Sequence, residues 1–266
     1  MTVGEWWYAK RHAVRTLWRM ARWLSNWREV WSAYRAGREV PPLRFRHGFT
    51  LDYGQHDDPV SLLHETFGER QYAQHIAAPD GLMIDLGANI GVVTLDWATR
   101  SEGLRVHAYE PNPPTNSVLR RNVEANGLAG RVVVHHEAVG RGGGELSLWT
   151  NVHSMVATGF GDAPPRAGGV RVSVPLIDLN EVVRRAGGGP VSLLKVDTEG
   201  AEADTLEGAT PETLAAIRQA IVEYHNSLCP DALERCRVVL ERAGFRCRVM
   251  PFKRSRQQGL IYATRA

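Results

Sequence analysis

Residues 83–98 of the chain read MIDLGANIGVVTLDWA, and this stretch decides the fold class. A short apolar run ends at Asp85 and Gly87, which predicts a buried strand followed by a tight turn. The residues after Gly91 predict a helix that extends through Trp97. A strand that turns directly into a helix is the repeating unit of parallel α/β sheets, so we expect this architecture for the surrounding sequence.

Strands and helices continue to alternate after this unit. Apolar runs and helical spacing predict strands at 105–111, 131–140, 191–197 and 220–225 and helices at 113–127, 178–186, 199–208 and 231–243. An insertion at 144–176 is expected to hold two strands around a loop rich in Gly and Pro. Residues 245–250 and 259–265 predict a final pair of strands. This order predicts an α/β fold with a doubly wound parallel sheet.

The positive charge of the chain is concentrated at its N-terminus. Residues 1–46 contain 10 Lys and Arg against 3 Asp and Glu, whereas the remaining residues contain 22 against 26. The main part of the chain is therefore slightly acidic, which argues against nucleic acid as a partner. Six of the 8 tryptophans also lie in residues 1–46. We expect a basic, Trp-rich amphipathic helical extension over 1–46 and one domain over 47–266. A hairpin at 43–54, which crosses this boundary, and a helix at 59–75 are expected before the alternating strands and helices.

Two roles are open for this extension. A basic helix rich in Trp fits an anionic membrane surface, and it equally fits packing on its own domain or on a second subunit. No run of 18 apolar residues predicts a membrane span, and arginines interrupt any apolar leader segment. Cys229, Cys236 and Cys247 fit no zinc spacing and are expected to be reduced thiols. A cytoplasmic protein is predicted, at the inner membrane face if the extension binds lipid.

Acidic residues follow the predicted strands at the points where ligands bind in α/β sheets. Asp85, Glu110, Asp197 and Glu223 each lie at the carboxyl end of a strand. Because the carboxyl ends of parallel strands meet at one edge, we expect these side chains to form a single site.

The first two of these ends predict a cofactor site. Gly87 and Gly91 allow a tight turn, but the loop lacks the third glycine of a dinucleotide fingerprint. Asp85 suits a cationic ligand, Glu110 can accept ribose hydroxyls, and Glu137 can meet an adenine. A ligand with these three parts is S-adenosylmethionine. The predicted cofactor contacts are Asp85, Gly87, Asn89, Gly91, Glu110, Asn112 and Glu137, although Asn112 could equally be a turn residue.

Three segments together resemble the FkbM family of S-adenosylmethionine-dependent methyltransferases. They read MIDLGANIGVVTLDWA, VHAYEPNPPTNSVLRRNVEANGL and LLKVDTEGAEADTLEGA, and the resemblance covers roughly residues 82–225. It implies a class I methyltransferase fold, Rossmann-like, whose sheet of about seven strands ends in a C-terminal antiparallel hairpin. It also implies O-methylation of a hydroxyl on a sugar, glycolipid or glycosylated natural product.

Methyl transfer to a hydroxyl requires an aligned acceptor and either a base or a metal ion. In one mechanism His225 or Asp197 takes the proton. In the other, Asp197 binds a divalent ion together with Glu199 or Glu223. The sequence does not determine a ligand count, so the metal is unknown. The residues predicted to take part in catalysis are Lys195, Asp197, Glu199, Glu223 and His225.

Several of these residues also have structural interpretations. Glu199 could have no role beyond stabilising a helix dipole. Glu202 is expected to be a solvated or salt-bridged helix residue. Lys195 on a buried strand is expected to pair with Asp197 or Glu223. The tandem His135–His136 is expected to pack and contact the cofactor. Acceptor contacts are expected at Asn151, His153 and Ser154.

Two other functions remain open on the residues alone. A nicotinamide-dependent oxidoreductase could use a similar sheet, although the missing third glycine argues against it. A non-catalytic module anchored by the Trp-rich segment is the other alternative, although the intact set of cofactor residues argues against it.

Overall fold

A seven-stranded sheet forms the centre of the computed structural model, which describes residues 17–18, 20–54, 72–73, 75–150, 170–252 and 255–265. The strand order is β11-β12-β10-β9-β3-β4-β5. The bounds are β3 (Leu82–Leu86), β4 (Arg105–Tyr109), β5 (Val132–His135), β9 (Leu193–Val196), β10 (Gln219–His225), β11 (Arg246–Phe252) and β12 (Ser255–Thr264). Neighbours among β3, β4, β5, β9 and β10 are parallel, and β12 is antiparallel to β10 and β11. The predicted class I sheet and its terminal hairpin are confirmed.

The chain reverses its direction across the sheet between β3 and β9. From β3 it continues outward to β4 and β5, and it later returns to place β9 on the other side of β3. Ligands bind in α/β sheets at the carboxyl ends of the strands beside this reversal. The loops after β3 and β9 therefore flank the expected binding site.

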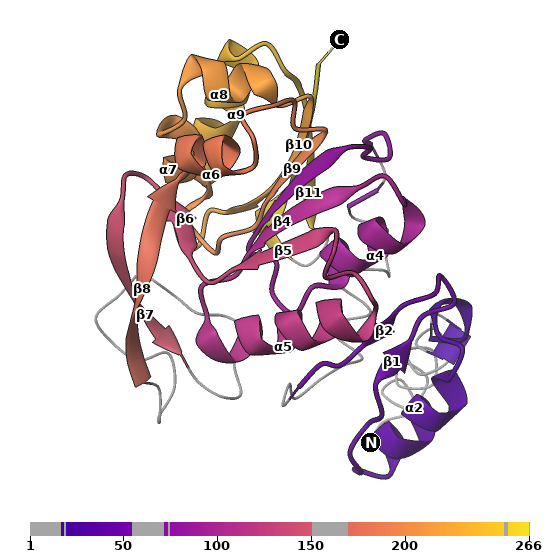
Figure 1. Cartoon of the computed structure of the whole chain (residues 1–266). Helices are drawn as coiled ribbons and strands as arrows, with labels where there is room; N and C mark the ends of the chain where they lie inside the picture. Colours follow the sequence, from indigo (N-terminus) through magenta and orange to yellow (C-terminus); the bar gives the residue numbers. More distant parts are fainter. Residues whose placement is uncertain are drawn as a thin grey trace, which may run out of the picture.

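Helices cover both faces of the sheet (Figure 1). On one face lie α4 (Val92–Arg100) and α5 (Pro113–Ala125), and on the other lie α6 (Leu179–Arg185), α7 (Glu202–Glu207), α8 (Pro211–Ala216) and α9 (Ala232–Arg242). Adjacent strand residues alternate between the faces, so Met83 packs in the first hydrophobic cluster and Ile84 in the second. Each such buried side chain stabilises the fold by about 1.5–3 kcal/mol. The short helix α8 had no counterpart in the sequence prediction.

The single strand predicted over 131–140 is wrong, because the structure divides it between two sheets. β5 ends at His135, and β6 (Ala138–Gly140) joins a separate three-stranded sheet. There it pairs with β8 (Val170–Asp178), which is antiparallel to β7 (Gly144–Thr150). Pairing with β8 provides hydrogen-bond partners for the backbone of β6 after the chain leaves the main sheet. The two strands predicted in the insertion are confirmed.

The N-terminal segment is helical in two pieces rather than one. Residues 20–23 are helical, Leu24 forms a bridge with Phe45, and α2 (Trp27–Arg35) starts only after a turn. Trp23 and Leu24 are buried in the same hydrophobic cluster as the sheet face covered by α4 and α5. This part of the extension therefore packs on its own domain, which is one of the roles expected from the sequence.

The predicted hairpin is present and is fixed to α5 by asparagine side chains. Its strands are β1 (Leu43–Arg44) and β2 (Thr50–Leu51). Asn126 exchanges two hydrogen bonds with the backbone of Thr50, and Asn122 exchanges two with the backbone of Asp52, at 2.7–2.8 Å. These amides pair with the backbone groups of β2 that another strand would otherwise pair with. Figure 1 shows the hairpin, in indigo, beside α5. The predicted domain boundary at residues 46 and 47 falls in the turn of this hairpin.

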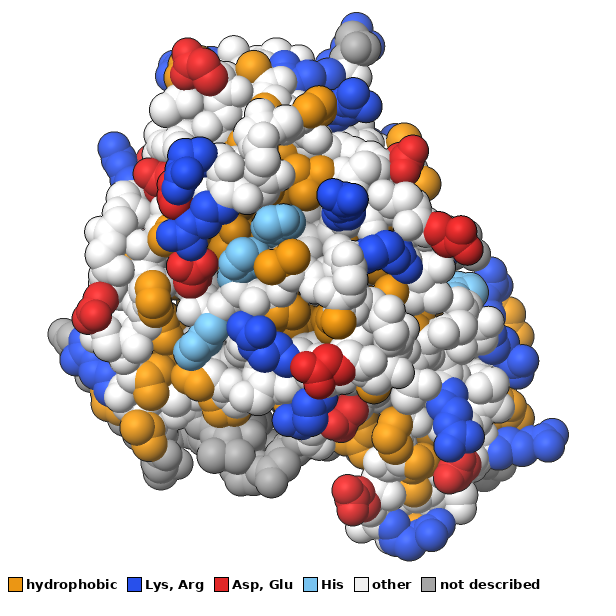
Figure 2. Space-filling view, in the orientation of Figure 1, with side chains coloured by type: hydrophobic (Ala, Val, Ile, Leu, Met, Phe, Trp, Pro, Cys, Tyr) orange, Lys and Arg blue, Asp and Glu red, His pale blue; other side chains and the backbone are white. Residues whose placement is uncertain are grey.

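Charges of both signs are interspersed on the face shown in Figure 2, where basic side chains form no continuous stripe. Within the described ranges, no helix has the length and hydropathy that a transmembrane span requires. Cys229, Cys236 and Cys247 are unpaired.

Candidate active site

The loop after β3 lies directly against the end of β9. Gly87 has a φ of +72°, and a Cβ on it would lie 1.8 Å from the carbonyl oxygen of Asp197. The Gly87 and Ala88 amides both donate to the carbonyl oxygen of Tyr109, at 3.0 and 2.9 Å. The predicted cofactor loop is therefore in backbone contact with the predicted reaction site.

Gly87→Ala is expected to lower the free energy of unfolding by about 2–4 kcal/mol, because it adds a steric overlap to an unfavourable φ. Gly127 is a matched control, since its φ of +67° is similar and a Cβ there would meet nothing within 4 Å. Gly127→Ala should cost about 1–2 kcal/mol through conformation alone. Urea unfolding of both variants gives the difference, and equal losses would contradict the close contact at Gly87.

Glu110 follows β4 and contacts the loop after β3. Its side chain is 6% exposed, and its two oxygens accept hydrogen bonds from the Asn89 and Asn112 amides, each at 2.9 Å. Burial raises the pKa of Glu110 to about 7. Each carboxylate oxygen keeps a further lone pair, so the group can also accept a ligand hydroxyl. Its role in ribose binding stays a prediction.

Asn112 precedes α5 and connects the two sheets. It is fully buried, and its Oδ1 accepts a hydrogen bond of 2.6 Å from the Thr150 hydroxyl at the end of β7. Asn112 therefore has a structural role beyond that of a turn residue, and its contact with the cofactor stays a prediction.

Asp85 and Lys195 form a buried ion pair beneath the loop. The Lys195 Nζ lies 3.0 Å from Asp85 Oδ1 and 3.5 Å from Asp197 Oδ2, and it donates to the Gly87 carbonyl at 2.9 Å. Burial alone would lower the pKa of Lys195, but the two carboxylates raise it above its ordinary value. Asp85 also accepts a bond from the Thr94 hydroxyl. Pairing with Asp197 is confirmed, but the nearer partner is Asp85, which had not been predicted. No contact tests the expected role of Asp85 toward a cationic ligand.

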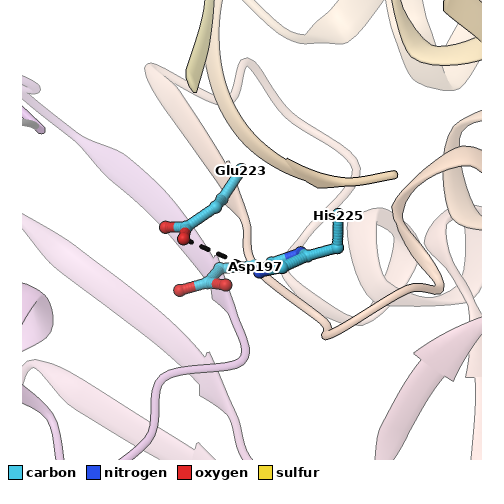
Figure 3. Close-up of side chains that lie close together, drawn as sticks. All are labelled: Asp197, Glu223 and His225. Carbon is cyan, nitrogen blue, oxygen red and sulfur yellow. Dashed lines mark ion pairs between the residues drawn. The ribbon is translucent and has the colours of Figure 1, made fainter. Parts of the chain in front are cut away.

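Asp197, Glu223 and His225 converge where β9 and β10 end (Figure 3). One potential ligand atom from each lies within 4.8 Å of the others. Glu223 and His225 are two residues apart on β10 and so project from the same face of the strand. Tyr72 donates a hydrogen bond of 2.8 Å to Glu223 Oε2, and its hydroxyl lies 3.4 Å from Asp197 Oδ2. The structure thus brings Asp197, Glu223 and His225 together as predicted and adds Tyr72.

Of the two interpretations of Glu202, the salt-bridged one is confirmed and the solvated one is wrong. Its side chain is fully buried, and its Oε1 lies 3.0 Å from His225 Nδ1. It also accepts bonds from the amides of Thr198 and Gly200. The signal was present in the sequence, because Glu202 shares a helix face with Thr205 and Leu206, which are also buried.

Glu199 does not begin the following helix as predicted. α7 begins at Glu202, and Glu199 has a φ of +52° in the preceding turn. This conformation places its carboxylate 3.5 Å from His225 Nε2, with the side chain 33% exposed. Glu199 therefore lies beside His225 rather than in the first turn of a helix. Asp197, Glu199, Glu223 and His225 together are called the acidic cluster below.

Negative charge exceeds positive charge in this cluster. Burial and the neighbouring Asp197 raise the pKa of Glu199 to about 7 and also raise that of Glu223. Burial would lower the pKa of His225, but its bond to Glu202 and the nearby Glu199 raise it to about 9. Burial raises the pKa of the Tyr72 hydroxyl well above its ordinary value, so this group remains a donor.

The remaining predicted residues lie elsewhere or outside the described residues. Glu137 pairs with Arg185 at 2.8 and 3.0 Å, and its expected contact with adenine stays a prediction. His135 stacks on Tyr109 with ring centroids 4.2 Å apart, which confirms packing for this residue. Asn151, His153 and Ser154 fall outside the described residues. No sequence pattern pointed to Tyr72, because its partners lie more than a hundred residues away.

Comparisons with known proteins identify the family. The family model described as the methyltransferase FkbM domain matches residues 85–247. The 31-O-demethyl-FK506 methyltransferase FkbM of Streptomyces tacrolimicus is 27% identical over 216 residues, which cover 70% of this chain and 82% of that protein. The hexuronic acid methyltransferase AglP of Haloferax volcanii is 27% identical over 161 residues, which cover 58% and 60%.

A solved structure agrees with the fold. The methyltransferase FkbM from Methylobacillus flagellatus superposes with a TM-score of 0.52 at 15% identity and covers 95% of this chain and 59% of its own. The matched family model spans more than half of the chain and describes a methyltransferase. The nicotinamide-dependent and non-catalytic alternatives are therefore not supported. The chain belongs to the FkbM family of methyltransferases, which implies S-adenosylmethionine as the methyl donor.

Proposed function

We propose that this protein methylates a hydroxyl oxygen of a sugar, glycolipid or glycosylated natural product. The observation that supports this best is the backbone contact between Gly87 of the cofactor loop and Asp197 of the acidic cluster. A partly exposed cluster of carboxylates beside a methyl donor suits an acceptor with several hydroxyl groups, because hydroxyls donate hydrogen bonds to carboxylates. One relative is named for an oxygen position of a natural product and another for a hexuronic acid.

The residues at the cofactor end fit S-adenosylmethionine in their chemistry. Glu110 offers a carboxylate with lone pairs left for ribose hydroxyls, and Gly87 and Gly91 give the loop the positive φ angles that its tight turn needs. When bound, S-adenosylmethionine supplies an electrophilic methyl carbon attached to a sulfonium. We infer that Glu110 fixes the ribose, while the loop fixes the orientation of the methyl group toward Asp197.

The chain's own residues then have to orient the acceptor and accept its proton. As the oxygen–carbon bond forms and the carbon–sulfur bond breaks, the hydroxyl proton leaves to a base of the cluster. The side chains of Glu199, Asp197 and Glu223 are 33%, 22% and 15% exposed, so Glu199 is the most accessible of the three to an acceptor. Positioned groups of this kind contribute about 10²–10⁴-fold to a rate.

A transfer assay with labelled S-adenosylmethionine tests this function. The acceptors are free hexuronic acids, hexuronic acid glycosides, hydroxylated macrolides and glycolipid fractions, and the methylated position is determined afterwards. Label in an ether on a hydroxyl oxygen is expected. Label on nitrogen or carbon would contradict O-methylation, and label in a carboxyl ester would contradict methylation of a hydroxyl. Cofactor binding without transfer to any of these classes would contradict the acceptor class.

Affinity for S-adenosylmethionine is expected to fall as the pH drops below about 7. The raised pKa of Glu110 means that this carboxyl is protonated at lower pH, and a protonated carboxyl accepts ribose hydroxyls poorly. Binding must then release a proton, so the dissociation constant should rise by up to about tenfold per pH unit. Calorimetry in buffers of different ionisation enthalpy measures both effects. Glu110→Gln should bind weakly at every pH, and a wild-type affinity that is constant from pH 8 to 5.5 would contradict the assignment.

A further inference from the structure

The cluster at the ends of β9 and β10 contains the donor atoms of a metal site. Asp197 and Glu223 each offer a carboxylate oxygen and His225 offers a ring nitrogen, all within 4.8 Å of one another. Figure 3 shows the two carboxylates and the imidazole directed toward a common space. Octahedral ligands of a small divalent ion lie about 3 Å apart, so closing this set requires side-chain rotations and no change in the strands.

His225 is a buried residue whose second ring nitrogen, Nε2, lies on the side of Glu199 and Glu223. Its side chain is 2% exposed, and Nδ1 is held by Glu202 at 3.0 Å. Nε2 forms no hydrogen bond to another described residue, and its nearest carboxylate oxygens are those of Glu199 at 3.5 Å and Glu223 at 3.6 Å. A carboxylate behind one ring nitrogen and an open second nitrogen is the usual arrangement of a metal-binding histidine.

The charges around this nitrogen also favour a cation. Five carboxylates lie in or next to the cluster, and the cationic groups among them are Lys195 and, when protonated, His225. The five are Asp85, Asp197, Glu199, Glu202 and Glu223. Lys195 is already engaged by Asp85 and by the Gly87 carbonyl. Uncompensated charge is unfavourable at buried positions, so a bound cation would relieve the remaining repulsion.

We propose that Asp197, Glu223 and His225 bind a divalent first-row metal ion, for which Mn²⁺ is the representative. A set of two carboxylates and one imidazole suits such an ion better than Ca²⁺, which prefers oxygen ligands alone. Glu202 is a positioning residue that orients the ring, and Tyr72 orients Glu223. In its catalytic part this inference rests on the proposed function. The ion would polarise the acceptor hydroxyl, and with Nε2 bound to the ion the hydroxyl proton passes to the carboxylate of Glu199.

Binding of Mn²⁺ to the chelator-treated full chain tests the site directly. The electron paramagnetic resonance signal of free Mn²⁺ reports binding without any turnover. The wild type should bind one ion, and Asp197→Asn and Glu223→Gln should weaken binding by more than about 100-fold. Glu202→Gln should weaken it by about 10–100-fold, since it acts through His225. Glu102→Gln removes an exposed carboxylate in the turn after α4 and should bind as the wild type does.

Two results would overturn the site. One is the absence of stoichiometric Mn²⁺ binding by a wild type that still binds S-adenosylhomocysteine. The other is binding that Asp197→Asn and Glu223→Gln leave unchanged. Retained S-adenosylhomocysteine binding by both variants ensures that a lost Mn²⁺ site reflects lost ligands and not unfolding.

Two measurements on the same protein distinguish failure of the metal site from failure of the proposed function. Methyl transfer that persists in excess chelator, by a chain that binds no Mn²⁺, would remove the metal site and leave the O-methyltransferase intact. Stoichiometric Mn²⁺ binding by a chain that methylates none of the hydroxyl acceptors would remove the proposed function and leave the metal site.

Discussion

Methyl transfer by Asp197→Asn is expected to fall by about 10²–10⁴-fold, while affinity for S-adenosylmethionine changes little. Asp197 lies in the acidic cluster, and the substitution removes a proton acceptor or metal ligand without changing the shape of the side chain. Glu110 and the glycine loop remain intact, so binding of the donor should survive. Single-turnover rates with saturating donor and calorimetric binding of S-adenosylhomocysteine measure the two quantities.

The stability of Asp197→Asn distinguishes a chemical effect from an unfolding effect. Asp197 is crowded by Glu199 and Glu223, and removing one charge relieves their repulsion. Lys195 keeps Asp85 as its partner, so no buried charge becomes unpaired. The thermal midpoint should therefore stay the same or rise. Wild-type rates in Asp197→Asn would contradict a reactive role, and Glu102→Gln serves as the unaffected comparison.

Lys195→Met is expected to lower the free energy of unfolding by about 3–5 kcal/mol. The substitution leaves the fully buried Asp85 without its counter-charge, and Asp85 then keeps only the Thr94 hydroxyl as a described partner. It also removes the donor to the Gly87 carbonyl. Urea unfolding measures the loss, which is a large part of the stability of an ordinary domain.

A double-mutant cycle tests whether the ion pair is responsible. Lys195→Met combined with Asp85→Asn should recover part of the loss, because the uncompensated charge is gone. Arg121 forms an ion pair with Asp52 in which both side chains are well exposed, so Arg121→Met should change stability little. Additive losses in the double variant would mean that Lys195 acts through packing rather than through Asp85.

Local patterns were sufficient to predict most of the sheet and the outline of the site. Apolar runs that end in acids located β3, β4, β9 and β10, because parallel strands in a central sheet are buried on both faces. The convergence of Asp197, Glu223 and His225 follows from those strand ends. This part of the molecule depends on residues that are close in sequence or repeated in each strand.

Contacts between distant segments explain the parts that could not be predicted. Tyr72 reaches Glu223 across 151 positions, and no spacing encodes such a pair. The division of 131–140 depends on β8, which lies more than thirty residues farther along the chain. The sequence left Glu202 as either solvated or salt-bridged, because a charged helix residue is usually solvated, and only its distant partner, the buried His225, accounts for its burial.

The hydrogen bonds that attach β2 to α5 hold the hairpin in place without depending on the identity of the residues at positions 50 and 52. Asn122 and Asn126 form hydrogen bonds only with backbone atoms of Thr50 and Asp52 in this attachment, so they make no demand on which side chains those positions have. The hairpin can therefore accumulate substitutions at these positions over evolutionary time and still remain docked. We expect the two asparagines to be under stronger selection than the strand that they hold, which would let the N-terminal region diversify while the catalytic sheet is inherited unchanged.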